Sequence, residues 1–337
     1  MIRYGIAGFG LHAVKRLMPG FAGAQNSQAV ALARRNLRQA TADAKQYSLA
    51  HAFATTRELC ECREVDAVFV TSPNSVHLAD VLTCIEHGKH VLCEKPMAMN
   101  AAEAEQMVAA ANRRGVVLGV AQCFRFCKTL EGIRESIHAG EIGRVVAIRV
   151  DFSFPGLKSV RRWLHDSTVA GGGPIADIGV HCLDAMRFIL GDEPVSCSAM
   201  TENDEFSGNV EAAAALSLRF RKGALGSSFV SFRAPYHTVI EIAGTEGNIV
   251  SHDGLTVDYP VVVEFRTGNG VRREEMSNAD AYSRQVDAFS SAIETCGRFA
   301  ATGDDGLQNQ RILDALYESA RTRTETLIVP IETATRV

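Results

Sequence analysis

The sequence has 337 residues, of which 46% are hydrophobic and 22% are charged. A chain of this length can bury a large core and is longer than one typical domain, so we expect two domains. The composition excludes a disordered chain. The formal net charge of −4 argues against a basic surface for nucleic acid or membranes, so small molecules are the expected partners.

Three features of the sequence bear on location. No apolar run of about 18 residues or more occurs, so no membrane span is expected. The first residues lead into a strand pattern rather than a secretory signal. The nine cysteines are scattered without the paired spacing of a zinc site. We therefore expect reduced thiols, no bound metal and a cytoplasmic protein.

Apolar segments alternate with helical patterns in the N-terminal part of the chain. The expected strands are Arg3–Ala7, Ala29–Ala33, Ala67–Thr71, His90–Cys93 and Val116–Val120. The expected helices include Leu37–Tyr47, His77–His87 and Ala101–Arg114, the last capped by Asn100. This alternation predicts a doubly wound parallel sheet, a Rossmann domain over residues 1–122.

Strands dominate the pattern beyond residue 122. One helix is expected near Leu130–Ala139 and another at Gly306–Arg321. Strands are expected within residues 144–154, 211–220, 224–232, 238–244 and 260–267. We therefore predict an α/β domain over residues 123–337, with a large, open and mostly antiparallel sheet.

A glycine motif, "GIAGFGLHA", follows the first expected strand. Gly8 permits a tight turn, and Gly10 lets the backbone approach a pyrophosphate. Leu11 opens a helix whose free N–H groups face the phosphates, and Ala13 is small enough for close packing. Glycines in such turns are often only structural. The position at the first strand–helix junction nevertheless predicts a dinucleotide site.

The end of the second strand bears on the choice of cofactor. An NAD-binding fold usually places an acidic residue there, but this chain has Arg34 and Arg35. Guanidinium groups suit a 2′-phosphate better than a neutral ribose, which predicts NADP, with NAD as the alternative. The alternative is that both arginines are simply exposed to solvent and have no role in binding the cofactor.

Polar residues follow two further strands. In a doubly wound sheet the carboxyl ends of the strands line the ligand crevice. We therefore expect cofactor contacts from Thr71, Pro73, Asn74, His77, Glu94 and Lys95. Lys95 is also a candidate proton donor or electrostatic anchor for a reacting oxygen. An ordinary Glu–Lys surface pair remains the alternative.

A second group of candidates lies in "GGGPIADIGVH". Pro174 suits the first turn of a helix, on which Asp177 and His181 are four residues apart and project from one face. Gly179 between them suggests close packing against the backbone. A carboxylate beside an imidazole can support acid–base chemistry. A structural histidine held by the aspartate is the competing interpretation.

Several motifs together resemble the Gfo/Idh/MocA oxidoreductases. They are "GIAGFG", "VDAVFVTSPNSVH", "GKHVLCEKPMA", "GEIGRV", "AGGGPIADIGVH" and "GTEGNI". Within the family the chain is similar to glucose–fructose oxidoreductase and NADP-linked sugar dehydrogenases. The resemblance implies that Lys95, Asp177 and His181 form the catalytic group. It also implies dimers or tetramers through the C-terminal sheet. Glucose–fructose oxidoreductase has tyrosine where His181 stands and is exported, so its internally recycled cofactor is not assumed here.

The resulting expectation is an NADP(H)-dependent oxidoreductase that transfers a hydride between nicotinamide and a sugar or polyol. His181 would exchange the proton, Asp177 would orient it, and Lys95 would bind the reacting oxygen. Arg125 and Trp163 are candidate substrate contacts. The alternatives are a catalytically silent dinucleotide or sugar sensor, a trans-dihydrodiol-type dehydrogenase, and a zinc-dependent alcohol dehydrogenase for which no metal site is evident.

Overall fold

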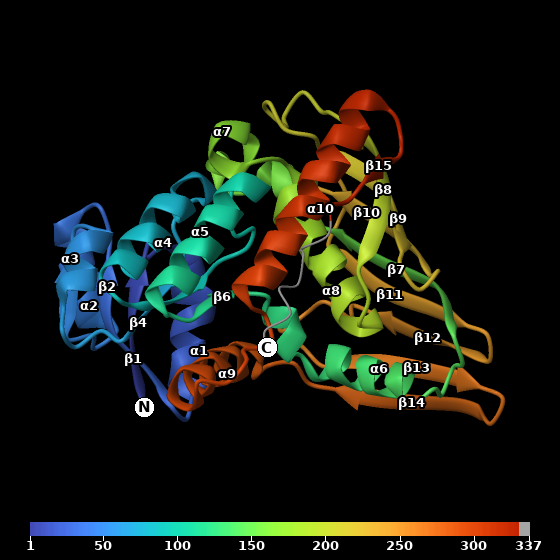
Figure 1. Cartoon of the computed structure of the whole chain (residues 1–337), viewed down its shortest axis with the longest axis horizontal. Coiled ribbons are helices and arrows are strands. Elements are labelled where there is room, and N and C mark those ends of the chain that lie inside the picture. The colour runs from blue at the N-terminus through green and yellow to red at the C-terminus, as the bar shows by residue number, and fades with distance from the viewer. Residues whose placement is uncertain (330–337) are drawn as a thin grey trace. The chain divides into compact units, whose positions relative to one another are not determined.

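The computed structural model describes residues 1–329, which divide into two compact units (Figure 1). Unit 1 comprises Met1–Phe126 and Ala279–Leu307, and unit 2 comprises Cys127–Asn278 and the described chain from Gln308 onward. The predicted division after residue 122 differs from this one in two respects: the first boundary follows Phe126, and residues 279–307 return to unit 1. Within residues 1–329, no helix is long and apolar enough to cross a membrane.

Unit 1 contains a parallel sheet with the Rossmann topology that the sequence predicts. Its order is β3-β2-β1-β4-β5-β6. β1 and β4 are neighbours at the centre, and the strands that follow each of them extend toward opposite edges of the sheet. The strands are β1 (Ile2–Ala7), β2 (Ser27–Ala33), β3 (His51–Phe53), β4 (Ala67–Val70), β5 (His90–Cys93) and β6 (Leu118–Val120). β3 was not predicted.

Helices connect these strands, with α4 and α5 on the side of the sheet opposite α1 and α9 (Figure 1). The helix after β1 consists of a π-helical turn, η1 (Ala13–Leu17), followed by α1 (Met18–Gly23). The others are α2 (Leu37–Gln46), α3 (Thr56–Glu61), α4 (His77–Glu86), α5 (Ala101–Arg114) and α9 (Ala281–Thr295), with short 3₁₀ turns η2 (Asn74–Val76) and η3 (Cys123–Phe126). Asn100 caps α5 by accepting a hydrogen bond from the Glu103 backbone, as predicted.

The return of α9 to unit 1 follows from buried contacts with the sheet. The Tyr4 hydroxyl on β1 is 2.8 Å from the Ser290 hydroxyl on α9. A Cβ atom on Gly119 of β6 would lie 2.8 Å from the ring of Phe299, just beyond α9. Because these partners lie far apart in sequence, hydrophobic periodicity alone carries no signal for this pairing.

Unit 2 is built on a nine-stranded, mostly antiparallel sheet, as expected. Its order is β14-β13-β12-β11-β7-β10-β9-β8-β15, and β7 and β10 form a parallel pair within it. The strands are β7 (Val145–Ser153), β8 (Pro194–Glu202), β9 (Ala213–Phe220), β10 (Leu225–Ser231), β11 (His237–Gly244), β12 (Gly247–His252), β13 (Val261–Thr267), β14 (Gly270–Met276) and β15 (Thr326–Leu327).

Helices cover one face of this sheet, and within residues 1–329 no helix covers the other, open face (Figure 1). The helical segments are α6 (Lys128–His138), η4 (Gly156–Lys158), η5 (Arg162–His165), α7 (Ser167–Ala170), η6 (Ile175–Gly179), α8 (Val180–Leu190) and α10 (Gly303–Thr322), whose first residues belong to unit 1. Strand residues alternate between buried and exposed, as in a sheet with one solvated face. On that open face Phe229 is 46% exposed and Met200 is 75% exposed.

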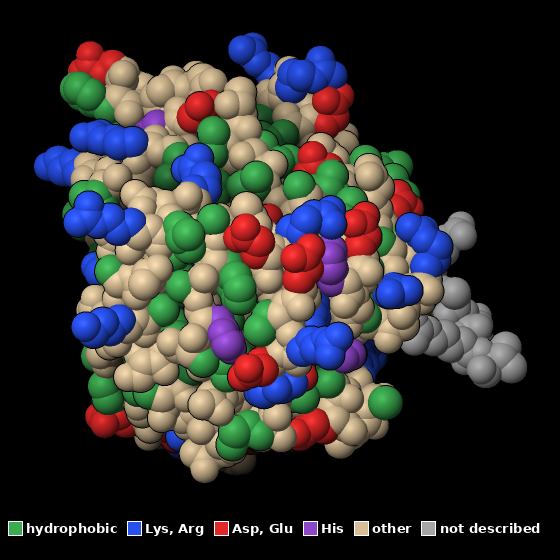
Figure 2. Space-filling view, turned by 90° about the vertical axis from the view of Figure 1, so that its left-hand side faces the viewer, with side chains coloured by type: hydrophobic (Ala, Val, Ile, Leu, Met, Phe, Trp, Pro, Cys, Tyr) green, Lys and Arg blue, Asp and Glu red, His purple; other side chains and the backbone are tan. Residues whose placement is uncertain are grey.

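Figure 2 shows basic and acidic side chains interspersed over one surface of the molecule. This distribution agrees with the small net charge of −4. An electrostatic footprint for nucleic acid would instead gather Lys and Arg on one face.

Candidate active site

The loop after β1 has the geometry that its glycine motif predicts. Gly8 has a φ of 82°, in the left-handed region that favours glycine. A Cβ atom here would lie 2.5 Å from the backbone nitrogen of Ser72. The Thr71 hydroxyl donates a hydrogen bond to the Gly8 carbonyl oxygen at 2.9 Å. The turn is therefore packed tightly against the residues that follow β4.

The second glycine leaves backbone accessible at the start of the helix. A Cβ atom on Gly10 would meet only the Gly8 carbonyl oxygen, at 3.6 Å. The side chain of Leu11 is exposed, whereas Ala13 is fully buried, as the small third position of the motif requires. A tight turn, open backbone and free helical N–H groups fit the pyrophosphate of a dinucleotide.

Glu94, which follows β5, contacts the glycine motif through His12. Its Oε1 atom lies 2.9 Å from Nε2 of His12. Burial raises the pKa of Glu94, but the nearby His12 and Lys95 outweigh it, so the pKa lies below its ordinary value. Glu94 is therefore a carboxylate at neutral pH. His12 was not among the predicted site residues, because its partner lies on a distant strand.

Lys95 is half-buried and follows Glu94 directly. Its backbone N–H donates a hydrogen bond to Oε2 of Glu94 at 3.2 Å, and the Lys95–Pro96 peptide bond is cis. The fully buried His77 has Nδ1 at 3.1 Å from the Pro96 carbonyl oxygen and Nε2 at 2.8 Å from that of Ser72. His77 thus joins two loops at this edge, a geometry that favours a positioning role over direct cofactor contact.

The remaining predicted cofactor residues near β4 occupy the same edge. Thr71 and Pro73 are half-buried and Asn74 is buried, all between β4 and α4. Through Thr71, His77 and His12, unit 1 brings together the loops after β1, β4 and β5. These are the carboxyl ends of neighbouring parallel strands, where doubly wound folds bind ligands.

Tyr282 is a further residue at this edge that the sequence analysis did not identify. It lies on α9, with its ring 6.0 Å from the His12 ring in an edge-on arrangement. Burial, with Cys123 and Glu94 nearby, raises the pKa of Tyr282 well above its ordinary value, so the phenol is neutral. No local motif marks Tyr282, because α9 joins unit 1 only through the tertiary fold.

The two arginines after β2 have different surroundings. Arg34 pairs with Asp43 of α2, with Nη1 and Oδ2 2.6 Å apart. Arg35 is exposed, and so is Arg38 in the first turn of α2. Asn36 caps this helix by accepting a hydrogen bond from the Gln39 backbone. The end of β2 thus presents guanidinium groups, of which Arg34 is engaged within the protein.

In unit 2, Asp177 and His181 lie on the consecutive segments η6 and α8, and both are buried. The prediction of a regular α-helix from Pro174 is wrong in the first turn, where the Val180 N–H donates to the Ile175 carbonyl in π-helical geometry. The close neighbour predicted at Gly179 is the Pro174 carbonyl oxygen, which would lie 3.3 Å from a Cβ atom added there. Single π turns occur frequently at functional sites.

Glu211 holds the glycine run that precedes η6. Its carboxylate accepts hydrogen bonds from the backbone nitrogens of Gly173 and Ile175 and from the Tyr317 hydroxyl, each at 3.0 Å. A Cβ atom on Gly172 would overlap the Tyr317 hydroxyl. Burial raises the pKa of Glu211. This network fixes the start of the helical segment that carries Asp177.

One aromatic ring contacts His181, and one basic side chain pairs with Asp177. The Phe152 ring on β7 stacks on the His181 ring with centroids 6.2 Å apart and an interplanar angle of 27°. Nη2 of Arg161 lies 3.8 Å from Oδ2 of Asp177. The predicted substrate residue Trp163 is half-buried in η5, two residues after Arg161.

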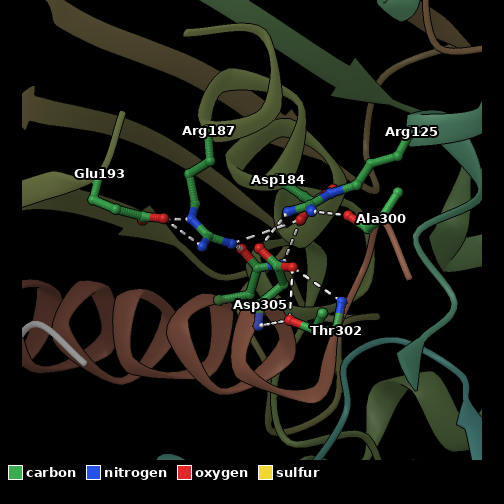
Figure 3. A network of polar contacts seen from close by, with 8 residues as sticks. Arg125, Asp184, Arg187, Glu193, Ala300, Thr302 and Asp305 are labelled. Carbon is green, nitrogen blue, oxygen red and sulfur yellow. Dashed lines mark hydrogen bonds and ion pairs between the residues drawn. The ribbon is translucent and has the colours of Figure 1, made fainter. Parts of the chain in front are cut away.

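Arg125, the other predicted substrate residue, belongs to a buried polar network (Figure 3). Its guanidinium donates to the Ala300 carbonyl oxygen at 2.6 Å and to Oδ1 of Asp305 at 3.2 Å. Asp305 also accepts hydrogen bonds from the backbone and hydroxyl of Thr302, at the start of α10. These contacts favour a structural role for Arg125.

A second buried arginine in Figure 3 belongs to unit 2. Arg187 donates two hydrogen bonds to the Glu193 carboxylate, at 2.6 and 2.7 Å, and one to Oδ1 of Asn309 at 2.7 Å. The Asn309 amide in turn donates to Asp184 at 2.8 Å. Asp184, which continues the helical face of Asp177 in sequence, is therefore part of a structural network. Residues 1–329 contain no group of three or more His, Cys, Asp or Glu placed to hold a metal ion.

The fold and the glycine turn define a dinucleotide-binding protein, and comparison with known proteins gives its family. Residues 2–122 match the model of the oxidoreductase family with an NAD-binding Rossmann fold, and residues 130–250 match the GFO/IDH/MocA C-terminal domain. The chain is 32% identical over 324 residues to 1,5-anhydro-D-fructose reductase of Ensifer adhaerens, covering 96% of this chain and 97% of that protein. It belongs to the Gfo/Idh/MocA oxidoreductase family.

Two further proteins show the same full-length similarity. D-xylose 1-dehydrogenase (NADP(+)) 2 of Haloferax volcanii is 30% identical, with 95% of this chain and 97% of that protein covered. The crystal structure of aldose-aldose oxidoreductase from Caulobacter crescentus, complexed with glycerol, superposes with a TM-score of 0.91 at 27% identity, covering 97% of this chain and 99% of that one. The likeness therefore extends over both units.

Proposed function

We propose that the protein is an NADP(H)-dependent oxidoreductase that interconverts a CH–OH group of a sugar or polyol with the corresponding carbonyl or lactone. The observation that carries this proposal is the edge of unit 1 where the Gly8 turn, the Glu94 carboxylate and Lys95 are joined by direct contacts. The three relatives described above have names that refer to sugars. Their similarity spans this chain almost completely.

The proposed mechanism assigns one task to each of three side chains. When bound, the nicotinamide supplies or accepts the hydride. The Lys95 ammonium donates a hydrogen bond to the reacting oxygen and stabilises negative charge on it. The His181 imidazole exchanges the hydroxyl proton, and Asp177 orients that imidazole.

We propose supporting roles for the other predicted residues. The cofactor would lie along Gly8, Gly10, Leu11, Thr71, Pro73, Asn74 and Glu94. His77 and His12 would hold the loops that carry these residues, because both make contacts between loops or strands. Trp163 would offer an aromatic face to the apolar side of a sugar ring.

NADP is the proposed cofactor because the end of β2 carries arginines and no acidic residue. Arg35 and Arg38 are exposed at this end and suit a 2′-phosphate. Arg34 is engaged by Asp43 and would act mainly by holding α2 to the strand. The name of the Haloferax volcanii relative also specifies NADP(+).

A substrate panel tests the proposed activity and cofactor together. Aldoses, polyols, keto-sugars and trans-dihydrodiols are each offered with NADP or NAD, and with the reduced cofactors for the carbonyl compounds, while nicotinamide absorbance is followed. We expect turnover with at least one sugar or polyol and a preference for NADP of about tenfold or more, the value of one lost charge-assisted contact. A preference for NAD would contradict the role of Arg35. Tight cofactor binding without any turnover would favour a sensor.

We also propose a homodimer or homotetramer formed through the open sheet of unit 2. Phe229 pairs with Ala215, which pairs with Met200, so these side chains form a row on the open face. Their exposure is large for a sheet surface in water. We expect light scattering to give a multiple of the chain mass, and a smaller mass for Met200→Glu. The control Val160→Glu, exposed but off the sheet, should leave the measured mass unchanged. A monomeric wild type would refute the proposal.

A reducing, cytoplasmic location is the proposed setting for this enzyme. All nine cysteines are free thiols, and eight of them are at least partly buried. The Cys60 thiol donates a hydrogen bond to the sulfur of Cys84 at 3.4 Å, and no disulfide joins the two. Free thiols in close pairs are typical of proteins from reducing compartments.

A further inference from the structure

The segment from Pro155 to His165 in unit 2 combines positive charge with a fixed position. It contains Lys158, Arg161 and Arg162 and no acidic residue, although the whole chain has a net charge of −4. Phe232, after β10, anchors it, since a Cβ atom on Gly156 would lie 2.5 Å from the Phe232 ring. The Leu157 backbone nitrogen also donates to the Phe232 carbonyl oxygen at 3.4 Å.

Within this segment, Arg161 is the residue directed at the candidate catalytic pair. Its Nη2 atom is 3.8 Å from Oδ2 of Asp177, which is an ion pair but too long for a hydrogen bond. The side chain is 38% exposed. Within the described residues, the guanidinium of Arg161 donates no hydrogen bond to a protein acceptor. Its donors therefore remain available to a ligand.

Arg187 shows what a structural arginine looks like in the same unit. Its side chain is 3% exposed, and its guanidinium donates hydrogen bonds to Glu193 and Asn309. Arg161 has the opposite character: a solvent-accessible guanidinium that, among residues 1–329, pairs with one carboxylate at long range. A purely structural role for Arg161 is therefore not supported, because its guanidinium does not make the hydrogen bonds that hold Arg187 in place.

We propose that Arg161 binds an anionic group of the substrate, so that the natural substrate is an acidic sugar carrying a carboxylate or a phosphate. This inference rests on the proposed function, because it places the substrate beside Asp177. A guanidinium presents five N–H donors in a planar fork that matches both anions. It can bridge the substrate anion and the Asp177 carboxylate, which offsets the repulsion between these two negative groups.

The test uses three hexoses that differ only at C6: D-glucose, D-glucuronate and D-glucose 6-phosphate. Each is assayed with the full-length protein and NADP, for the wild type, Arg161→Gln and Arg162→Gln. We expect an acidic sugar to be the best of the three for the wild type. Arg161→Gln should lower its kcat/KM by about tenfold to a hundredfold, the value of a hydrogen bond to a charged group. The change on glucose should stay below about threefold.

The matched control separates a directed contact from general charge. Arg162 adjoins Arg161 but is exposed and forms no ion pair within the described chain, so Arg162→Gln should change all three substrates by less than about threefold. Selective loss on glucuronate identifies a carboxylate, and selective loss on glucose 6-phosphate identifies a phosphate. Equal loss on all three sugars in Arg161→Gln would overturn the proposal and make Arg161 a positioning residue for Asp177.

Binding measurements keep this inference separate from the activity itself. Calorimetry of the same three compounds with the NADP-loaded protein reports affinity when no hexose is oxidised. Tighter binding of an acidic sugar that is lost in Arg161→Gln supports the anion site even if the substrate panel shows no turnover. Equal binding of the three sugars, or no binding of any, overturns the anion site. The oxidoreductase proposal is then still tested separately by the substrate panel.

Discussion

Lys95→Ala is expected to abolish most of the turnover while leaving cofactor binding nearly intact. Loss of a group that stabilises charge on the reacting oxygen costs about a hundredfold or more in kcat. The cofactor should still bind, because the Lys95 side chain makes neither the Thr71–Gly8 hydrogen bond nor the His12–Glu94 contact. The measurements are kcat on the best panel substrate and the NADPH dissociation constant from fluorescence.

Two comparison variants make the Lys95 prediction specific. Lys95→Arg keeps the charge but changes its reach and geometry, so it should recover little of the lost activity. Lys45→Ala removes an exposed lysine on α2 and should leave both quantities unchanged. Wild-type kcat in Lys95→Ala would remove Lys95 from the mechanism. A loss of NADPH affinity as large as the loss of kcat would instead make it a cofactor-binding residue.

The parts of the fold that sequence analysis predicted are those with a local signal. The alternation of apolar strands and helices predicted the parallel sheet of unit 1, and Gly8 marked its first turn because only a residue without Cβ fits against Ser72. β3 was missed because it has three residues, none of them fully buried, so it lacks a hydrophobic run. The asparagine before α5 was recognised because a capping side chain acts within three residues.

Long-range contacts account for what the sequence did not reveal. α9 packs in unit 1 through Ser290 and its partner Tyr4, which are separated by most of the chain. The His12–Glu94 pair and the Glu211 network likewise join residues that are far apart in the sequence, so no local pattern marks these contacts. The π turn in η6 was not predicted, because the sequence analysis assumed the spacing of a regular α-helix.

The candidate site shows the same division between local and tertiary information. Lys95, Asp177 and His181 were identified from motifs, and the structure places them at a strand end and on a helical segment as expected. Arg125 was also predicted to contact the substrate, but its guanidinium donates a hydrogen bond to Asp305. Whether an arginine is open to a ligand or satisfied by the protein depends on its partners, which residue type and spacing do not specify.

His181→Asn is expected to lower kcat by about a hundredfold to ten-thousandfold, the contribution of a positioned acid–base group. The asparagine is smaller and remains polar, so the stacking partner Phe152 and the buried helix α8 should retain their places. The decisive readout is the dependence of kcat on pH. The limb that reports proton transfer in the wild type should disappear in the variant, because asparagine does not titrate in this range.

The control for His181 is His138→Asn on α6, which removes an exposed imidazole from the same unit. It should leave both kcat and its pH profile unchanged. If His181→Asn lowers kcat but preserves the shape of the wild-type profile, His181 supports the site without transferring the proton. The acid–base role would then have to come from another group, with Lys95 the next candidate because an ammonium at a partly buried position can also exchange a proton.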